Sequence, residues 1–328
     1  MSTRGNASVV FESLVADATM AASSHNTQPW RFEIGENLIR IMPDFLRRCP
    51  IVDPDDHHLY VSLGCAAENM VLAAASKGWG AVVEVRSSGD AHWVEVMLHP
   101  GTPVPSLLAD AIPRRQCTRA PYDGRQPSVD DLLLLERAAS GKGVTPILIT
   151  DKNRLATVAE FVAQGNTVQL RDPGWRKELI AWIRFNEREA RRTLDGLWSR
   201  TSGNPEMPRA LGELLLRVAL TPRTQNRKDV PWTKNSAGVL VLVSDADDAS
   251  HWIEAGRCYE RFALQATVLG LRNAFINQPV EVATLRRQLA NWLGVGSRRP
   301  DLVVRFGYGP QMPKSFRRPV TDVLLAAG

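Results

Sequence analysis

Eight consecutive residues, Ser23-Ser24-His25-Asn26-Thr27-Gln28-Pro29-Trp30, combine hydroxyl groups, two side-chain amides and a proline-fixed turn. Hydroxyls and amides both donate and accept hydrogen bonds, so a turn built from them suits one edge of a planar polar ligand. The same composition is also typical of the ordinary turn that follows a helix. The residues alone leave these two interpretations evenly balanced.

Two basic segments offer charge for a phosphate group. Arg114-Arg115-Gln116-Cys117-Thr118-Arg119 places guanidinium groups four residues apart, and Pro313-Lys314-Ser315-Phe316-Arg317-Arg318-Pro319 lies near the C-terminus. Arginine is the preferred residue for contacting phosphate through two hydrogen bonds. Taken alone, the first segment is better explained as surface charge on a linker, and the second is a weak signal by itself.

Several familiar motifs are missing from the sequence, which has no Gly-x-Gly-x-x-Gly, P-loop, Gly-x-Ser-x-Gly or His-Glu-x-x-His. These absences argue against a Rossmann dinucleotide site and against P-loop, α/β-hydrolase and zinc-protease chemistry. His57 and His58 are adjacent, a spacing that does not place both rings on one helix face, so no metal site is predicted. The four cysteines are scattered without a Cys-x-x-Cys pair, as in proteins of a reducing compartment.

The elements that position these residues follow an α+β pattern. Apolar residues at helical spacing indicate helices, and alternating or short apolar runs indicate strands. Helices are predicted at 9–22, 57–77, 129–139, 153–170, 175–196, 251–269 and 280–293, and strands at 30–34, 38–42, 81–86, 92–98, 145–150, 238–244, 272–276 and 301–307.

The order of these elements repeats. The helix at 57–77 and the two strands after it match the helix at 251–269 and the strands at 272–276 and 301–307. We therefore expect two related halves, residues 1–110 and 111–328. Residues 171–234 have no counterpart in the first half, and we call this segment the insertion. It holds 14 Lys and Arg against 8 Asp and Glu, together with four tryptophans.

The overall composition is that of an ordinary globular protein, with 44% apolar and 23% charged residues in 328. The net charge of +5 is small for this length, and no recognised module for binding nucleic acid is present, so no such partner is expected. No apolar run reaches the ~18–20 residues of a membrane span, and the N-terminus has no signal-peptide pattern. A cytoplasmic protein is expected.

The motifs resemble those of one family when they are taken together. The segment from Ala22 to Phe32 resembles the Pro-Ser-x-x-Asn-x-Gln-Pro-Trp-x-Phe signature of the FMN-dependent nitroreductases. Arg115-Gln116-Cys117-Thr118-Arg119 is similar to their Arg-x-Ser-x-Arg/Lys motif, and the basic tail is similar to their closing motif. Here the Gln-Pro-Trp copy precedes the Arg motif, the reverse of the usual order. The arrangement resembles the Acg-type branch, and it implies an α+β fold whose two halves form a pseudo-dimer with one complete flavin site.

The resemblance also implies a role for each site residue. The ribityl chain and ring edge of the flavin are expected to contact Ser23, Ser24, Asn26 and Gln28. Arg115 is expected to contact the phosphate or ribityl group. Arg119 lies near the N1/O2 edge of the flavin, where a fixed cation stabilises the reduced state. Asn277 and Gln278 present main-chain N–H groups to N5 and O4, and Arg317 gives a second phosphate contact. Cys117 replaces the usual hydroxyl residue and loses a hydrogen bond of about 0.5–1.5 kcal/mol. No catalytic side chain is predicted, and His25 is not considered one.

Two functions follow from the resemblance. In the first, FMN is held between the halves, is reduced by NAD(P)H, and passes hydride through N5 to an unknown small-molecule acceptor. In the second, the insertion is a lid that closes the site to NAD(P)H and makes the protein a flavin store. Because the usual dimer surface is already used within the chain, a monomer is expected.

Overall fold

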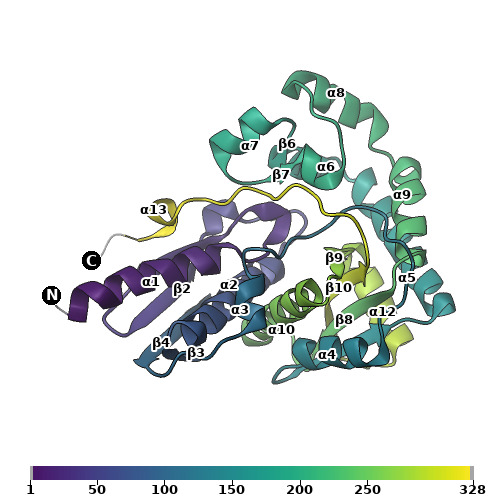
Figure 1. The fold of residues 1–328 in the computed structure, drawn as a ribbon. Coiled ribbons are helices and arrows are strands. Elements are labelled where there is room, and N and C mark those ends of the chain that lie inside the picture. The colour runs from purple at the N-terminus through teal and green to yellow at the C-terminus, as the bar shows by residue number, and fades with distance from the viewer. Residues whose placement is uncertain (1–2, 326–328) are drawn as a thin grey trace.

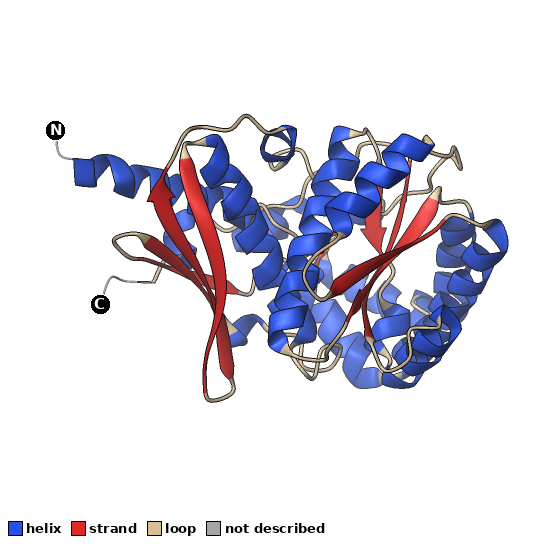
Figure 2. Cartoon of the chain, turned by 90° about the horizontal axis from the view of Figure 1, so that it is seen from below, coloured by secondary structure: helices blue, strands red, loops and turns tan. Residues whose placement is uncertain are grey.

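Two long helices, α2 (His57–Ser76) and α10 (Ala249–Val268), lie side by side at the centre of the molecule (Figure 1). The computed structural model describes residues 3–325. A four-stranded sheet lies on each side of the helix pair, so that helices separate the two sheets (Figure 2). This mixed arrangement is the predicted α+β fold.

The first half contains one antiparallel sheet with α2 packed against it. Its strands are joined in the order β1-β2-β4-β3, and every neighbouring pair is antiparallel. The elements are α1 (Thr3–Thr19), β1 (Trp30–Ile34), β2 (Leu38–Pro43), α2, β3 (Trp79–Ser88), β4 (Ala91–Pro100) and α3 (Leu107–Ala111).

The second half repeats this topology. Its sheet has the order β5-β8-β10-β9, so the first, second, fourth and third strands are neighbours in both halves, and all pairs are again antiparallel. The elements are α4 (Val129–Ala139), β5 (Val144–Ile149), β8 (Gly238–Ser244), α10, β9 (Arg272–Phe275), α11 (Gln278–Glu281), α12 (Ala283–Leu293) and β10 (Arg299–Gly307). The repeat predicted from the sequence is therefore present in three dimensions.

The two central helices cross at a pair of equivalent glycines. Gly64 and Gly256 are each the eighth residue of a 20-residue helix. A Cβ atom on Gly64 would lie 1.9 Å from the main-chain oxygen of Ile253, and one on Gly256 would lie 2.0 Å from that of Val61. Ile253 and Val61 are also equivalent positions, so the contact is reciprocal. Reciprocal contacts are what a twofold axis produces.

The insertion falls between β5 and β8 and is built differently from the prediction. A single helix over 175–196 is wrong, because Asp172 caps a helix that begins at Pro173, and a second helix begins after Asn186. The elements between β5 and β8 are α5 (Lys152–Arg171), which ends where the insertion begins, and then α6 (Pro173–Trp182), β6 (Ile183–Arg184), α7 (Glu187–Thr193), β7 (Leu197–Trp198), α8 (Arg209–Ala219) and α9 (Pro222–Lys234). The helix predicted at 280–293 is also two helices, α11 and α12, which meet at Val282.

The C-terminal segment returns to the first half. After β10 the chain runs below the insertion to α13 (Val320–Val323), which lies near α1 (Figure 1). The Leu325 N–H donates to the carbonyl oxygen of Phe32 on β1 at 2.7 Å. The last residues, which the sequence assigned to the second half, thus pack against the first.

Among the described residues, α2 alone is long and apolar enough to cross a membrane, and 78% of its most apolar window is buried inside the fold. Its apolar side chains belong to the main hydrophobic core, together with those of α1, α10 and the first sheet. The helix therefore serves as a core element here.

Candidate flavin site

Two adjoining cavities, of about 230 and 60 Å³, lie between the halves and below the insertion. The larger cavity is enclosed by residues 23–30, which we call the anchor loop, together with α2, the segment after β9 and the insertion. The smaller cavity is enclosed by the Arg115–Arg119 segment and the C-terminal segment. Both are lined by Ala22, Ser23, Arg119, Leu197 and Phe275. The two cavities are therefore neighbours with differently composed walls.

The anchor loop is held in a strained conformation. His25, Asn26 and Gln28 have φ angles of 48°, 55° and 54°. These angles lie in the left-handed region, which residues other than glycine rarely adopt. Such strain persists only where surrounding contacts fix it, and it clusters at functional sites. Here the Ser23 hydroxyl accepts a hydrogen bond from the Gln28 N–H at 3.1 Å. The Asn26 amide donates to the carbonyl of Gly196 at 3.1 Å and to that of Phe316 at 3.2 Å.

The smaller cavity is lined by four cationic side chains, Arg115, Arg119, Lys314 and Arg317, and by no carboxylate. Arg115 is buried and forms an ion pair with Glu260 on α10 at 2.8 Å. Arg317 donates to the Asn26 Oδ1 at 2.9 Å, while its buried Nε has no partner among the described residues. Burial, and then the charge of Arg115, lower the pKa of Arg317 to about 10, so it stays charged at neutral pH. The cavity thus carries excess positive charge.

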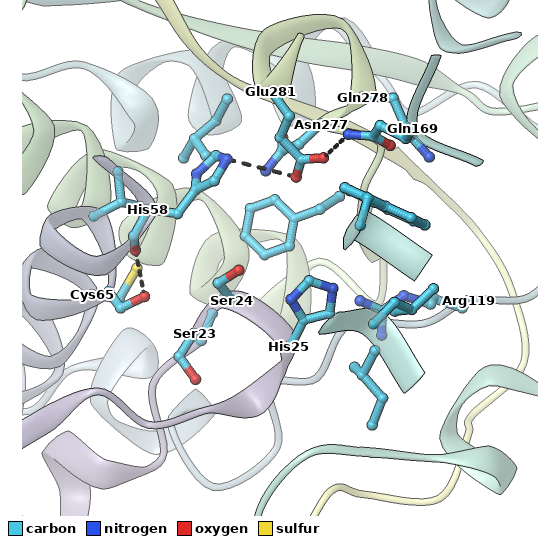
Figure 3. A pocket seen from close by; sticks show the side chains of 18 of the residues that line it. Ser23, Ser24, His25, His58, Cys65, Arg119, Gln169, Asn277, Gln278 and Glu281 are labelled. Atoms are coloured by element: carbon cyan, nitrogen blue, oxygen red, sulfur yellow. Dashed lines mark hydrogen bonds and ion pairs between the residues drawn. The ribbon is translucent and has the colours of Figure 1, made fainter. Parts of the chain in front are cut away.

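Arg119 lines both cavities and has no hydrogen-bond or ion-pair partner within the part of the chain that the structure describes. A half-buried guanidinium without an acceptor loses hydration without compensation, which an anionic or carbonyl-bearing ligand would supply. Figure 3 shows Arg119 beside His25, with Asn277, Gln278 and Glu281 farther along the same cavity wall.

Nine of the ten predicted site residues line these cavities. The two halves both contribute to this set, which consists of Ser23, Ser24, Asn26, Arg115, Cys117, Arg119, Asn277, Gln278 and Arg317. Gln28 is the exception, because it is fully buried and lines neither cavity. Its amide donates to the Leu194 carbonyl at 2.8 Å, and its Oε1 accepts from the Arg318 N–H at 2.8 Å. Gln28 therefore joins the anchor loop to the insertion and to the C-terminal segment.

The side chains of Asn277 and Gln278 are used by the fold. Asn277 Oδ1 accepts the Val303 N–H at 2.9 Å, and the Gln278 amide donates to Asn166 Oδ1 at 3.1 Å. These bonds fix the segment after β9 where it borders the larger cavity. Cys117 lines the smaller cavity and is partly exposed, with its Sγ 3.6 Å from the Tyr259 hydroxyl.

Besides the thiol of Cys65, three titratable side chains of the larger cavity were not predicted to contribute, namely His25, His58 and Glu281. Burial, and then the charges of Arg119 and His58, lower the pKa of His25 to about 4, so its ring is neutral at pH 7. His58 Nε2 lies 3.6 Å from Glu281 Oε1, and Glu281 Oε2 accepts from the Gln169 amide at 2.6 Å (Figure 3). Burial raises the pKa of Glu281 and lowers that of His58.

Other lining residues come from elements that the sequence placed but did not connect to the site. His58, Ser62 and Cys65 lie three or four residues apart on α2 and share its cavity face. This spacing of small and polar residues on a predicted core helix could have indicated that one face of the helix borders a cavity. Trp175, Leu179, Leu197 and Gln225 reach the cavity from the insertion, and no local pattern shows that these distant segments converge.

His57 and His58 also lie closer than expected. Their ring centroids are 4.7 Å apart, and one ligand atom each from Asp53, His57 and His58 lies within 4.8 Å of the others. The Asp53 carboxylate already accepts the main-chain N–H groups of His58 and Leu59, at 2.9 and 3.0 Å. His57 Nε2 is hydrogen-bonded to Asp301 Oδ1 at 2.9 Å. The cluster is thus satisfied by the first turn of α2 and by β10.

Comparison with curated proteins aligns almost the whole chain with two relatives from Mycobacterium tuberculosis H37Rv. "Putative NAD(P)H nitroreductase Rv3131" is 29% identical over 322 residues, which cover 94% of this chain and 88% of that protein. "Putative NAD(P)H nitroreductase acg" is 24% identical over 337 residues, covering 96% and 95%. The predicted resemblance is thus confirmed: over almost its whole length the chain is similar to proteins named NAD(P)H nitroreductases, acg among them. No family profile matches the sequence.

Solved nitroreductases are similar to about two thirds of this chain. A nitroreductase with bound FMN from Bacteroides fragilis is 15% identical and covers 65% of this chain and 96% of its own, with a TM-score of 0.40. A nitroreductase with bound FMN from Desulfitobacterium hafniense is 13% identical and covers 69% of this chain and 100% of its own, also with a TM-score of 0.40.

Proposed function

We propose that the protein is an FMN-dependent oxidoreductase that holds one flavin between its two halves. The observation that carries this proposal is the smaller cavity, to which the described residues contribute four cations and no carboxylate, beside a larger cavity with mixed polar and apolar walls. A phosphate suits the first, and a planar ring system suits the second. The names of the two mycobacterial relatives, both NAD(P)H nitroreductases, support the same assignment.

The residues present fit this cofactor. Arg317, with its buried Nε free, and Lys314 would hold the phosphate, while Ser23 and Asn26 would lie along the ribityl chain. Arg119, without a partner, would neutralise charge at the ring edge, and the main chain at Asn277 and Gln278 would face the ring. When bound, FMN supplies two-electron hydride chemistry between NAD(P)H and an acceptor. The chain orients the ring, excludes water through Trp175 and Leu179, and offers a proton from the His58–Glu281 pair.

We further propose one flavin per chain, because the equivalent position in the other half is filled. With Gly64 matched to Gly256, Ser62 corresponds to Glu254 and Cys65 to Arg257. Glu254 and Arg257 form an ion pair at 2.9 Å. The loop before β5 lies directly on this pair, since a Cβ on Gly141 would be 2.4 Å from both Glu254 Oε1 and Cys258 Sγ. No comparable space remains there for a ring.

The test is the stoichiometry and identity of the flavin. Purified protein should be yellow, and it should release one FMN per chain on denaturation. The apoprotein should bind FMN at least tenfold more tightly than riboflavin, which lacks the phosphate. Lys314→Gln should reduce this preference roughly tenfold, because a hydrogen bond to a charged group contributes about 1.5–3 kcal/mol. A colourless protein that takes up no FMN, or a preference unchanged by the substitution, would contradict the proposal.

A second candidate function is flavin storage, and the insertion favours it. Trp175, Leu179, Leu197 and Gln225 cover the larger cavity, where NAD(P)H and an acceptor would have to stack. Anaerobic rapid mixing with NADPH and NADH separates the two functions. Fast bleaching of the flavin absorbance excludes storage, whereas no bleaching together with normal photoreduction excludes an ordinary reductase. Trp175→Ala should restore bleaching if the insertion is the obstacle.

We also propose that the protein is a monomer, since α2 and α10 already form within one chain the reciprocal helix pair expected of two subunits. Light scattering at micromolar concentration should give a mass near 36.3 kDa. A mass of twice that value would contradict this.

A further inference from the structure

A third cavity, of about 300 Å³, lies wholly inside the insertion. Its walls come from α8, α9, β6 and the segment between β7 and α8. Most of its lining is apolar: Ile183, Phe185, Pro205, Met207, Leu215, Leu216, Ala219 and Leu220. This volume is at the lower end of the range for small-molecule sites, and such sites combine apolar walls with a few polar groups.

Lys228 is the one cation that lines this cavity. In the described part of the chain no carboxylate lies within ion-pair distance of it, and its Nζ reaches only the Ser202 carbonyl at 3.4 Å and the Trp232 ring, with the centroid at 4.6 Å. The neighbouring Asp229 is not within ion-pair distance, so its charge offsets the lost hydration of Lys228 only in part, and its Oδ2 accepts from the amides of Asn166 and Gln225, at 3.0 and 2.9 Å.

Two other shielded cations of the insertion have carboxylate partners. Arg184 bonds to Asp195 at 2.6 Å, and Arg209 lies 3.1 Å from Glu189 and 3.0 Å from Glu213. A half-buried ammonium group beside an apolar cavity loses hydration, and without a carboxylate in ion-pair contact that loss is only partly offset. The arrangement is complementary to a molecule with an anionic head and an apolar body.

The cavity is also accessible along an apolar helix face. Leu211, Leu214, Leu215 and Val218 follow one another at helical spacing on α8 and are all exposed. Leu215 is both exposed and part of the cavity wall, so the cavity reaches the surface at α8. In Figure 1, α8 is at the outer end of the insertion, away from both sheets.

We propose that this cavity is a second ligand site, which binds a small amphipathic carboxylate, with the carboxylate on Lys228 and the apolar body against Phe185, Leu216 and Leu220. Gln225 lines this cavity and the larger flavin-site cavity alike. The occupant would therefore lie beside the proposed flavin without entering its space. The site itself does not depend on the proposed function, since Lys228 lines neither of the two flavin-site cavities.

The test is calorimetric titration of the full-length purified protein with decanoate. We expect one decanoate per chain and much weaker binding of decanol, which has the same apolar body without the charge. Lys228→Met should weaken decanoate binding by roughly tenfold to a hundredfold, as for loss of a charge-assisted hydrogen bond. Lys234→Met, on the same helix but exposed, is the matched control and should bind as the wild type does.

A second variant tests the location without changing charge. Ala219→Trp places a bulky ring in the cavity wall and should abolish binding, with circular dichroism and melting temperature verifying that it folds. Absence of decanoate binding to the wild type at millimolar concentration overturns the proposal. Equal binding of decanol, or undiminished binding by Lys228→Met or Ala219→Trp, overturns it as well.

Discussion

His58 and Glu281 meet at the wall of the larger cavity, with Nε2 and Oε1 3.6 Å apart, although they belong to different halves. Burial shifts the pKa of each toward its neutral form, upward for Glu281 and downward for His58. A neutral carboxyl group beside a reacting ligand is the form that can give up a proton.

Glu281→Gln should therefore remove a pH dependence. In the wild type, we expect the rate of flavin reoxidation by a nitro or quinone acceptor to fall as pH rises through the raised pKa of Glu281. The amide variant keeps the hydrogen-bonding shape and should show a low rate without that fall. The rate is measured by stopped-flow absorbance between pH 5 and 9. Identical profiles would show that the proton comes from elsewhere.

Removal of the unpartnered guanidinium should make the flavin harder to reduce. Arg119→Gln loses a cation that would stabilise the negative charge of the reduced ring. At about 1.5–3 kcal/mol, the two-electron midpoint potential should become roughly 30–60 mV more negative. Reductive titration against dyes of known potential measures this. Arg125→Gln is the control, since Arg125 is exposed and pairs with Asp123 at 2.7 Å.

Substitution at the helix crossing should destabilise the protein. Gly64→Ala places a methyl group 1.9 Å from the Ile253 oxygen, and Gly256→Ala repeats the clash at Val61. Overpacking typically costs about 1–3 kcal/mol, whereas an unhindered Gly→Ala change within a helix stabilises by about 1 kcal/mol. A decrease in the free energy of unfolding would therefore show that the two helices are in contact at these glycines. Gly35→Ala is the control, because its nearest contact would be 3.4 Å away; stabilised crossing variants would mean that the helices do not touch there.

His25 should make the protein less stable in acid. Its pKa falls from an ordinary value of 6.5 to about 4 in the folded protein, first through burial and then through Arg119 and His58. Between these values the unfolded chain binds a proton that the folded chain does not, so stability is lost as pH falls through that window. His25→Gln should therefore show a shallower decline in melting temperature from pH 7 to 4.5. Parallel declines would mean that the ring is not shielded.

Much of the fold could be predicted because local signals coincide with the real boundaries. Ser128 caps α4 with a reciprocal hydrogen-bonded box, and the apolar run of β8 is buried along its whole length, so both elements begin and end as predicted. In the insertion, the local sequence signals do not coincide with the boundaries of the elements. Asp172, Asn186 and Leu194 divide it, and β6 pairs with β7 through only two residues each, which no periodicity can indicate.

The site was predictable where motifs are contiguous and not where it depends on distant packing. Ser23, Arg119 and Arg317 each stand in a recognisable segment, and all three line the cavities. Gln28 belongs to the same motif, but its amide is used to hold Leu194 and Arg318. Gln225 and Trp175 contribute because the insertion folds back over α2, a long-range event without a local signal.

The return of the C-terminal segment has a consequence for biosynthesis. Arg317 closes the smaller cavity by bonding to Asn26, 291 positions earlier in the chain. During translation, both sheets and the insertion are made before this arginine exists. A ribosome-bound chain that ends before residue 317 would therefore lack this contact, and the smaller cavity would close only once the segment around Arg317 has been made.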